Sequence, residues 1–271
     1  MSERRRPRYW LAKHVYLHAS RHGAVFLDVA QDAYLGISAT QSGALALLVA
    51  EWPEHDAVST VSEAEAQALA DALHTRGLLT RDRLEGHGAA PCAFARATRQ
   101  LVAWQNMTLR DVKLRYALRF IRAAVMAAVL LRVRTFEQLV TRHERRKAAA
   151  LESGGRRAEA GIDAPSSARG AAERSSAQSS ARRERELSAL MARQLLASVA
   201  YVRPWLYGFR GHCLFDSLAL IELLAGYGVF PHWVFGVQLR PFVAHTWVQQ
   251  GRYVLNGTPE HVSAFEPILV V

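Results

Sequence analysis

A cysteine and a histidine near the C-terminal end of the sequence have the residue types of a nucleophile and its general base. Cys213 follows Gly211-His212 and opens an apolar stretch of helical period. A thiol at a helix N-terminus lies near free backbone N–H groups and the positive end of the helix dipole, which favour the thiolate and hold a developing oxyanion. His245 follows on a predicted strand. This order predicts Cys213 as the nucleophile and His245 as its base.

The strands that follow the Cys213 helix decide what the His245 imidazole can reach. Alternating apolar residues predict three antiparallel strands, over residues 233–239, 244–249 and 253–256. Because successive side chains of a strand point to opposite faces, His245 and Trp247 share one face and Val248 points to the other. Whether His245 can act as a base therefore depends on which residues lie next to this face of the strand.

The hairpin between the last two strands could supply a third catalytic residue. A two-residue loop at 250–251 pairs His245 with Asn256, whose amide could then orient the imidazole. A three-residue loop instead opposes His245 to Gly257, and the third residue is lost. Asn256 before Gly257 is also typical of a turn. One residue of register separates these alternatives.

Each of these residues also has an interpretation without catalysis. A lone cysteine in an apolar setting is more often inert core, and a lone strand histidine is more often structural. We interpret Cys92 as structural and Asp216, one turn after Cys213, as a partner of the helix dipole. The sequence contains no phosphate loop, dinucleotide fingerprint, HExxH or GxSxG motif and no paired cysteines. We therefore predict neither a metal site nor an identifiable cofactor site.

The bulk composition bounds the class of protein. The chain has 271 residues, half of them apolar, and a formal net charge of +10. This charge favours an anionic partner, but no helix carries a basic reading face beside a wing, so we expect no nucleic-acid partner. The longest unbroken apolar run, residues 123–131, is too short to cross a bilayer, and no secretory signal is visible. With two distant cysteines, the sequence fits a soluble cytoplasmic protein.

Residues 1–85 form a predicted N-terminal unit with its own core. Period-two patterns over 15–19, 25–29 and 35–37 predict three short antiparallel strands. Two capping boxes, Ser38 to Gln41 and Ser62 to Glu65, then open two helices, the first running through Leu48 to Pro53 and the second stopping at Gly77.

The remainder divides into three segments. Residues 91–147 are predicted to be helical and basic, residues 148–185 form a low-complexity insertion rich in Ala, Ser, Gly and Arg, and residues 186–271 contain the Cys213 and His245 pattern. A helix near the start of this last segment is predicted to end at Pro204. The predicted fold class is α+β.

The stretch CLFDSLALIELLAGYGVFPHWVFGVQLRPFVAHTWVQQGRYVLN and the tail HVSAFEPILVV resemble the lasso peptide biosynthesis B proteins. The resemblance covers about residues 211–271 and implies a transglutaminase-like or papain-like cysteine peptidase domain, with Cys213, His245 and Asn256 as catalytic residues. Two departures stand out. Gly257 occupies the position where the family usually has Asp, and Asp216 stands where an Arg is frequent.

The N-terminal unit is similar to the PqqD-like winged-helix domain that recognises leader peptides in this family. The resemblance implies that a leader peptide adds as a strand beside the third strand, by backbone pairing at Tyr34, Leu35 and Gly36. It implies side-chain contacts from the second helix. The residues nominated there are Leu69, Ala72 and Leu73.

The family implies a leader peptidase that cleaves a ribosomally made precursor peptide. Its implied partner is an asparagine-synthetase-like, macrolactam-forming lasso cyclase, and some members depend on ATP. The alternative is a non-catalytic scaffold that binds the leader, its peptidase half degenerate because the Asp is missing.

Overall fold

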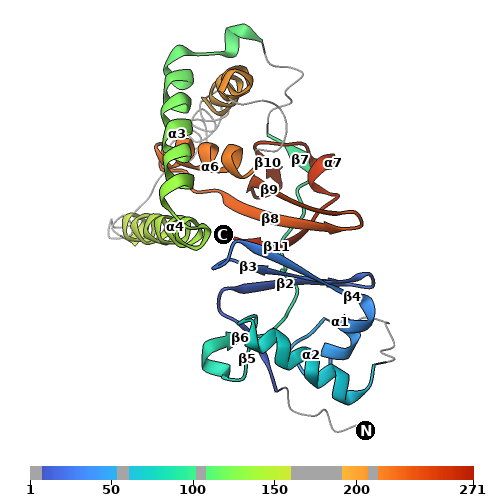
Figure 1. Cartoon of the computed structure of the whole chain (residues 1–271). Coiled ribbons are helices and arrows are strands. Elements are labelled where there is room, and N and C mark those ends of the chain that lie inside the picture. The colour runs from blue at the N-terminus through green and yellow to red at the C-terminus, as the bar shows by residue number, and fades with distance from the viewer. Residues whose placement is uncertain (1–7, 54–60, 102–107, 160–190, 207–212) are drawn as a thin grey trace, which may run out of the picture.

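The structure is a computed structural model that describes residues 8–53, 61–101, 108–159, 191–206 and 213–271. Two units lie one above the other (Figure 1). The N-terminal unit has a three-stranded sheet, a small second sheet and two helices, and the C-terminal unit has a five-stranded sheet covered by helices. The predicted α+β class is confirmed.

The larger N-terminal sheet is antiparallel, in the order β2-β3-β4. Its strands are β2 (Val15–Ser20), β3 (Gly23–Asp28) and β4 (Ala33–Ser38). The backbone φ angle is 129° at Gly23 and 51° at Asp32, values that glycine and aspartate tolerate better than most residues. The three strands were predicted from the sequence.

Both predicted capping boxes form in the N-terminal unit. Ser38 begins α1 (Ala39–Leu45), and Ser62 begins α2 (Glu63–Thr75), each with the reciprocal side-chain and backbone hydrogen bonds. Helix α1 ends before the predicted Leu48, whereas Gly77, with φ of 77°, follows α2 as predicted.

The N-terminal unit also has a second, small sheet that was not predicted from the sequence. It has the order β5-β1-β6, with β1 (Trp10–Ala12), β5 (Leu79–Thr80) and β6 (Gly86–His87), and a short helix η1 (Arg83–Glu85) precedes β6. Strands of two or three residues are too short to show an alternation in sequence.

Strand β3 is buried on both faces, and each face belongs to a different core. Phe26 packs with α1 and α2 residues in the core of the N-terminal unit. Val25, Leu27 and Val29 pack instead into the core of the C-terminal unit. Accordingly, β2 contacts β11 and β3 contacts β8. The N-terminal unit has the predicted core of its own. The other face of its β2-β3-β4 sheet packs into the core of the C-terminal unit.

The C-terminal sheet has the order β11-β8-β9-β10-β7. Its central hairpin joins two long strands, and shorter strands flank them. The strands are β7 (Arg99–Gln100), β8 (His232–Leu239), β9 (Phe242–Gln250), β10 (Tyr253–Val254) and β11 (Glu266–Val270). The three strands predicted here correspond to β8, β9 and β10.

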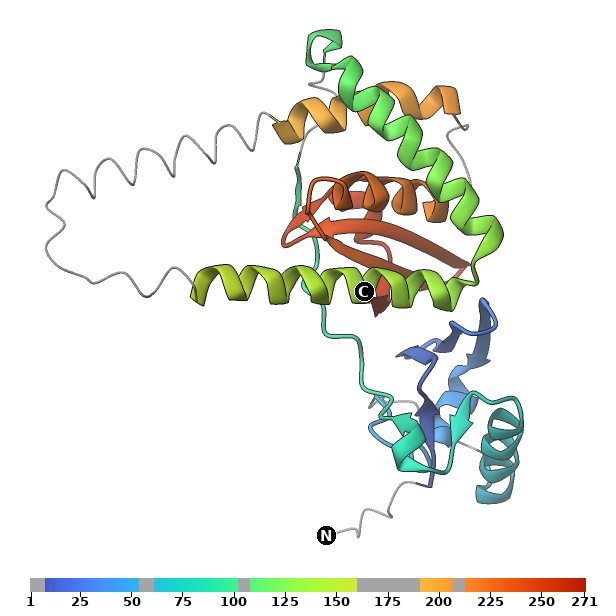
Figure 2. The same cartoon turned by 90° about the vertical axis from the view of Figure 1, so that its left-hand side faces the viewer.

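Helices enclose this sheet. Figure 2 shows α6 (Cys213–Ala225) between the sheet and a layer made by α3 (Leu114–Val133) and the helical residues 191–206, with α4 (Phe136–Glu159) on the side of the N-terminal unit. The short helices η3 (Leu109–Asp111) and α7 (Pro259–Val262) complete the unit. No helix within the described ranges is long and apolar enough to span a membrane.

The structure corrects three boundaries. Residues 91–98, predicted to be helical, form no helix and lead into β7. Helix α4 continues through residue 159, into the predicted low-complexity segment, because its Ala, Glu and Arg residues are good helix formers. Pro204 lies inside the helical residues 191–206 rather than after them. The rest of the predicted insertion, residues 160–185, lies outside the described residues.

Gly236 gives a testable expectation about the central hairpin. A Cβ at this position would lie 2.7 Å and 2.9 Å from ring atoms of Trp247 and 3.0 Å from Cβ of Phe265. We expect Gly236→Ala to lower the free energy of unfolding by about 1–3 kcal/mol in urea denaturation, because a packed core accepts extra volume poorly. Gly36→Ala is the control, since no atom lies within 4 Å of its added Cβ. Equal stability of the two variants would contradict this packing.

Candidate active site

Cys213 is the first residue of α6, as predicted, and its side chain is half-buried. A hydrogen bond joins this helix to the sheet. The Ser217 hydroxyl donates to the Thr246 carbonyl of β9 at 3.2 Å. Leucines and alanines of α6 pack with Val248 in the shared core. Helix α6 therefore covers the face of β9 that carries Thr246 and Val248.

A buried polar network lies one turn below Cys213. Asp216 is 3% exposed and forms an ion pair with Arg203, in which Nε of Arg203 and Oδ1 of Asp216 are 3.0 Å apart. The Asn256 amide donates to Oγ of Ser217 at 3.0 Å and to Oδ2 of Asp216 at 3.3 Å. The Asn256 side-chain oxygen accepts from the Val248 N–H at 2.8 Å. Asp216 thus has a cationic partner in addition to the predicted helix dipole.

His245 lies on the other face of β9. Its ring stacks on Trp247 and contacts the rings of His261 and Phe265, with centroid distances of 6.1, 4.7 and 5.0 Å. The predicted sharing of a face by His245 and Trp247 is confirmed. However, α6 covers the opposite face, and among the described residues no hydrogen bond joins the Cys213 thiol to the imidazole. The structure does not bring the predicted pair together.

The predicted role of Asn256 in orienting His245 is wrong for this structure. Strand β10 pairs Tyr253 with Gln250 and Val254 with Gln249, so the loop is 251–252 instead of 250–251. Gly251 takes the first loop position with φ of 56°, and Arg252 at the second has no positive φ; this is the pattern of a type II′ turn, whose first position favours glycine. The chain leaves β10 before Asn256, and the amide turns toward α6.

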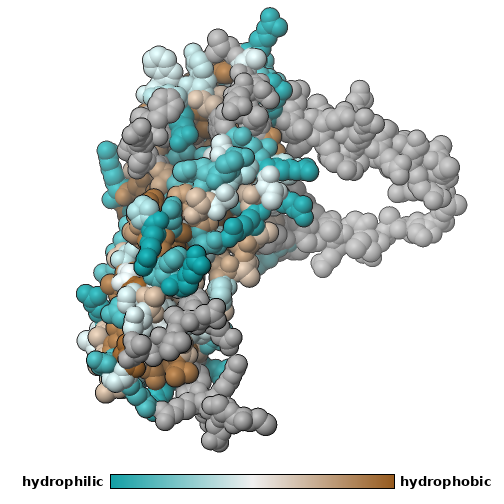
Figure 3. All heavy atoms as spheres, turned by 90° about the vertical axis from the view of Figure 1, so that its right-hand side faces the viewer, coloured by the Kyte–Doolittle hydropathy of each residue, from teal (hydrophilic) through white to brown (hydrophobic). Residues whose placement is uncertain are grey.

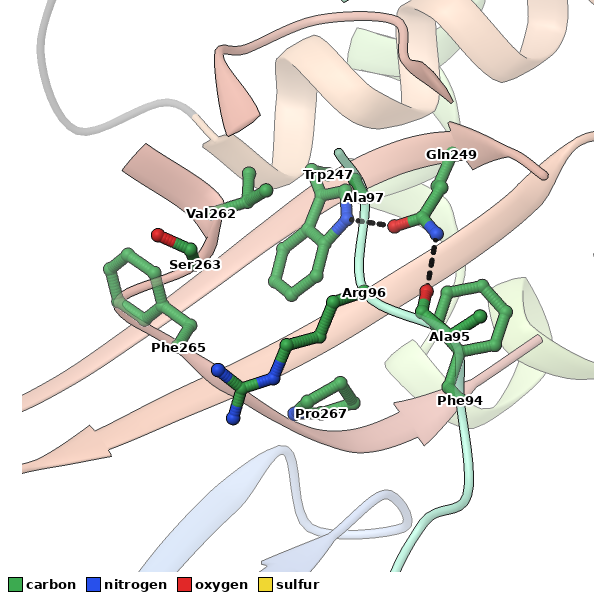
Figure 4. A pocket seen from close by; sticks show the side chains of 10 residues that line it. All are labelled: Phe94, Ala95, Arg96, Ala97, Trp247, Gln249, Val262, Ser263, Phe265 and Pro267. Carbon is green, nitrogen blue, oxygen red and sulfur yellow. Dashed lines mark hydrogen bonds between the residues drawn. The ribbon is translucent and has the colours of Figure 1, made fainter. Parts of the chain in front are cut away.

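The hollow next to the His245 face is filled by protein. Figure 4 shows Trp247 and Gln249 pointing from β9 toward the segment 94–97. The Trp247 indole donates to Oε1 of Gln249 at 3.0 Å, and the Gln249 amide donates to the Ala95 carbonyl at 2.8 Å. The segment 94–97, which was predicted to be helical, therefore packs against this face of the sheet in extended form. The complete lining consists of Phe94, Ala95, Arg96, Ala97, Trp247, Gln249, Val262, Ser263, Phe265 and Pro267.

The surroundings of His245 keep its imidazole neutral. Burial lowers the pKa of His245 to about 4, and the positive charges of His261 and Arg203 add to the effect. Since the ordinary value is about 6.5, the ring is uncharged throughout the range from pH 5 to 8. A neutral imidazole is the form that a general base needs.

This lowered pKa predicts a pH dependence of stability. Between pH 6.5 and 4 the unfolded chain binds a proton at residue 245 that the folded protein does not, so stability is full above pH 6.5 and falls as the pH drops toward 4. We expect this group to contribute about 1–3 kcal/mol of that loss. Urea denaturation of the wild type and His245→Gln at pH 7.5 and pH 4.5 measures it. An identical pH dependence in both proteins would contradict the assignment.

The N-terminal unit places one predicted peptide-binding residue at this site. The Tyr34 ring contacts the ring of Phe242, at the start of β9, with centroids 5.6 Å apart. Three causes together raise the pKa of Tyr34 to about 12: burial, which is the largest, and the charges of Asp32 and Cys213. Tyr34 therefore lies near the thiol, an arrangement that no local sequence signal indicated. Arg203 and Phe242 were also missed.

The other nominated peptide-binding residues have different positions. Gly36 is exposed on β4, and Leu35 packs toward the N-terminal core. On α2, Ala72 is exposed and Leu69 is half-buried, but Leu73 is 3% exposed and belongs to the core, so the nomination of Leu73 for peptide contact is wrong here. Helix α1 packs against β4, whereas α2 packs against α1 and β5.

Comparisons with known proteins concern mainly the C-terminal half of the chain. Residues 155–270 match the transglutaminase-like superfamily, so the C-terminal half of the chain contains a transglutaminase-like domain. One stretch of the chain is similar to the microcin J25-processing protein McjB of Escherichia coli, with 39% identity over 51 residues. That alignment covers 19% of this chain and 24% of McjB. No significant match to a solved structure was found.

Proposed function

We propose that this protein is a cysteine peptidase that binds a ribosomally made lasso peptide precursor and removes its leader. The observation that carries the proposal is the half-buried thiol of Cys213 at the N-terminus of α6, in a domain of transglutaminase-like type. The relationship to a microcin-processing protein supports a peptide precursor as the substrate class. The proposed partner is the asparagine-synthetase-like cyclase that closes the macrolactam, and the proposed location is the cytoplasm.

In the proposed reaction, the Cys213 thiolate attacks the scissile carbonyl and the backbone N–H groups at the start of α6 hold the oxyanion. The leader becomes bound to sulfur as a thioester, and the following peptide leaves as an amine. Water then releases the leader. His245 takes the thiol proton, gives it to the leaving amine and activates the water.

This assignment requires a movement of β9. Strand β10 pairs only with the 249–250 end of β9, so the end that contains His245 is hydrogen-bonded to a neighbouring strand only through β8 in the described residues. We include in the proposal that substrate binding breaks the pairing of His245 with Gly236 of β8, turns this end of β9 and brings the imidazole to the α6 side. Catalytic hydrogen bonds commonly tighten only in the substrate complex.

A second candidate function is a leader-binding scaffold without peptidase activity. It is favoured by the position of His245 across the sheet from α6 and by the use of Asn256 in a structural network. The two candidates predict different reactivities of the thiol.

Alkylation by iodoacetamide at pH 7 separates the candidates. For the peptidase we expect Cys213 to be labelled at least about tenfold faster than Cys92, because burial raises the pKa of Cys92 and the proposed reaction requires a reactive thiol at Cys213. Peptide mapping by mass spectrometry assigns the label, and Cys92→Ser gives the Cys213 rate alone. Slower labelling of Cys213 than of Cys92 would favour the scaffold.

A further inference from the structure

The outer face of α3 carries large apolar side chains that are exposed. Its inner face packs on α6 and is buried, for example at Tyr116 and Phe120. The exposed apolar residues recur at helical spacing over 114–133, so they form a stripe along a helix about 30 Å long. They are Leu114, Leu118, Val125, Met126, Val129 and Val133. A continuous apolar stripe of this kind marks an interaction surface, whereas single exposed apolar residues are ordinary.

A cavity of about 630 Å³ adjoins the stripe. Leu118, Arg122 and Met126, each four residues apart on α3, line one side of this cavity, and two of them belong to the stripe as well. Leu223 of α6 and Arg146 of α4 line other sides. The volume is in the range of sites that hold a ligand. The stripe and the cavity therefore form one continuous surface.

The cavity has an excess of positive charge. Glu222 is the carboxylate in its lining, and Oε1 of Glu222 already forms an ion pair with Nη1 of Arg146 at 2.7 Å. Arg119 lies over the ring of Tyr227, with Cζ 4.9 Å from the centroid. Within the described ranges, neither Arg119 nor Arg122 forms an ion pair or a hydrogen bond with a carboxylate. Two guanidinium groups of the cavity are thus available to an anionic group.

The cavity lies at the far end of α6 from the thiol. Cys213 begins this helix, whereas Glu222 and Leu223 belong to its last turn, so about 15 Å of helix separates them. Figure 2 views the side on which α3 covers α6, and Figure 3 shows the opposite side, where apolar and hydrophilic residues are mixed over both units. A partner bound at the cavity would therefore leave Cys213 accessible.

Three other occupants fit this surface less well than a helix of another protein. A bilayer could cover the stripe, but a flat lipid surface does not fill a cavity beside it. A second copy of this chain, bound through the same face, would bring one basic cavity against another, and like charges oppose such a contact. A small anion would neutralise the guanidinium groups but would leave the apolar stripe exposed.

We propose that α3 and this cavity form a docking surface for an acidic, amphipathic helix of a protein partner. The apolar side of that helix packs along the stripe, as in other cases of helix-in-groove recognition. Its carboxylates enter the cavity and bind the guanidinium groups of Arg119 and Arg122, because these charges are complementary. The surface is separate from the Cys213 site, so the inference does not depend on peptidase activity.

Two synthetic peptides test the chemistry of the partner with the wild-type, full-length protein. Both have about 20 residues, with leucines at helical spacing on one face; one carries glutamates beside the leucines, and the other carries lysines at the same positions. Fluorescence anisotropy at about 0.15 M salt measures their binding. We expect the glutamate peptide to bind at least about tenfold more tightly. Equal affinity of the two peptides, or no binding of the glutamate peptide, would overturn the inference.

A matched pair of variants tests the place of binding. Arg122→Glu reverses a charge in the cavity, and Arg132→Glu makes the same change at an exposed arginine of α3 outside the cavity. We expect Arg122→Glu to weaken binding of the glutamate peptide at least about tenfold and Arg132→Glu by less than about threefold. Both variants should keep the wild-type unfolding temperature and the wild-type alkylation rate of Cys213. Equal weakening by the two variants would show that the cavity is not the site.

Sedimentation velocity and vesicle flotation test two of the other occupants. We expect the protein alone to sediment as a monomer, and we expect no flotation with phosphatidylglycerol vesicles. A dimer that Leu118→Gln dissociates would assign the stripe to a second copy of the chain. Flotation that Arg122→Glu abolishes would assign the surface to anionic lipid. Either result would overturn the proposal of a protein helix.

Discussion

Replacing Cys213 by serine is expected to abolish precursor cleavage, with a loss of at least about a thousandfold in kcat/KM. The oxygen keeps the position and nearly the volume of the sulfur, but a serine hydroxyl is a far weaker nucleophile without a strong base in contact. The half-buried position at the start of α6 should tolerate the change, because the helix is anchored by Ser217 and by its apolar face. Chromatographic quantification of the released leader measures the rate.

The matched control for this variant is Cys92→Ser. Cys92 lies on the segment before β7 and has no part in the α6 site. It should keep the wild-type rate, and both variants should unfold at the wild-type temperature. If Cys213→Ser retained more than a small fraction of the cleavage activity, the thiol could not be the nucleophile, and the scaffold hypothesis would account better for the structure.

Removing the Asp216 carboxylate is expected to have the largest effect on stability among the polar residues of the site. Asp216→Ala leaves Arg203 without its anionic partner and the Asn256 amide without one of its acceptors, in a region where Asp216 itself is 3% exposed. Removing one partner of a buried ion pair costs about 3–5 kcal/mol, and we expect about 2–4 kcal/mol here because the Arg203 side chain is 30% exposed. Urea denaturation at pH 7 measures the loss.

A double-mutant cycle with Arg203→Gln provides the control for Asp216. If the two side chains act as a pair, the double variant should lose less than the sum of the single losses. The same variants should slow precursor cleavage, because the network positions the first turn of α6 under Cys213. Additive losses, or a loss below about 0.5 kcal/mol for Asp216→Ala, would contradict a structural role for this pair.

Local sequence signals predicted the elements well. The capping boxes at Ser38 and Ser62 placed two helix starts, and the alternation around Trp247 placed β9 and the face of His245. These features depend on residues close together in sequence, where propensity and period are informative. The extended segment 94–97 was mistaken for helix because its packing against Gln249 is a tertiary contact.

Contacts between distant segments were not predictable in the same way. The alternation of apolar residues predicted which side chains share a face of β9, but it did not predict which of the two faces α6 covers. The pairing of β9 with β10 depended on whether Gly251 begins the loop or ends it. The approach of Tyr34 to Cys213, and of Arg203 to Asp216, joins segments that only the fold brings together. The candidate active site is therefore the part of the molecule for which sequence alone was least informative.

The central claim, that the Cys213 thiol carries out the cleavage, is tested most directly by the covalent intermediate. The wild-type protein is mixed with the precursor peptide, quenched in acid within the first turnover and measured by intact-mass spectrometry. We expect a mass increase equal to the leader acyl group, mapped to the peptide that contains Cys213 and removed by hydroxylamine, as a thioester requires. Full cleavage of the precursor with no adduct on Cys213 at any quench time, and the same rate in Cys213→Ser, would contradict the proposed function.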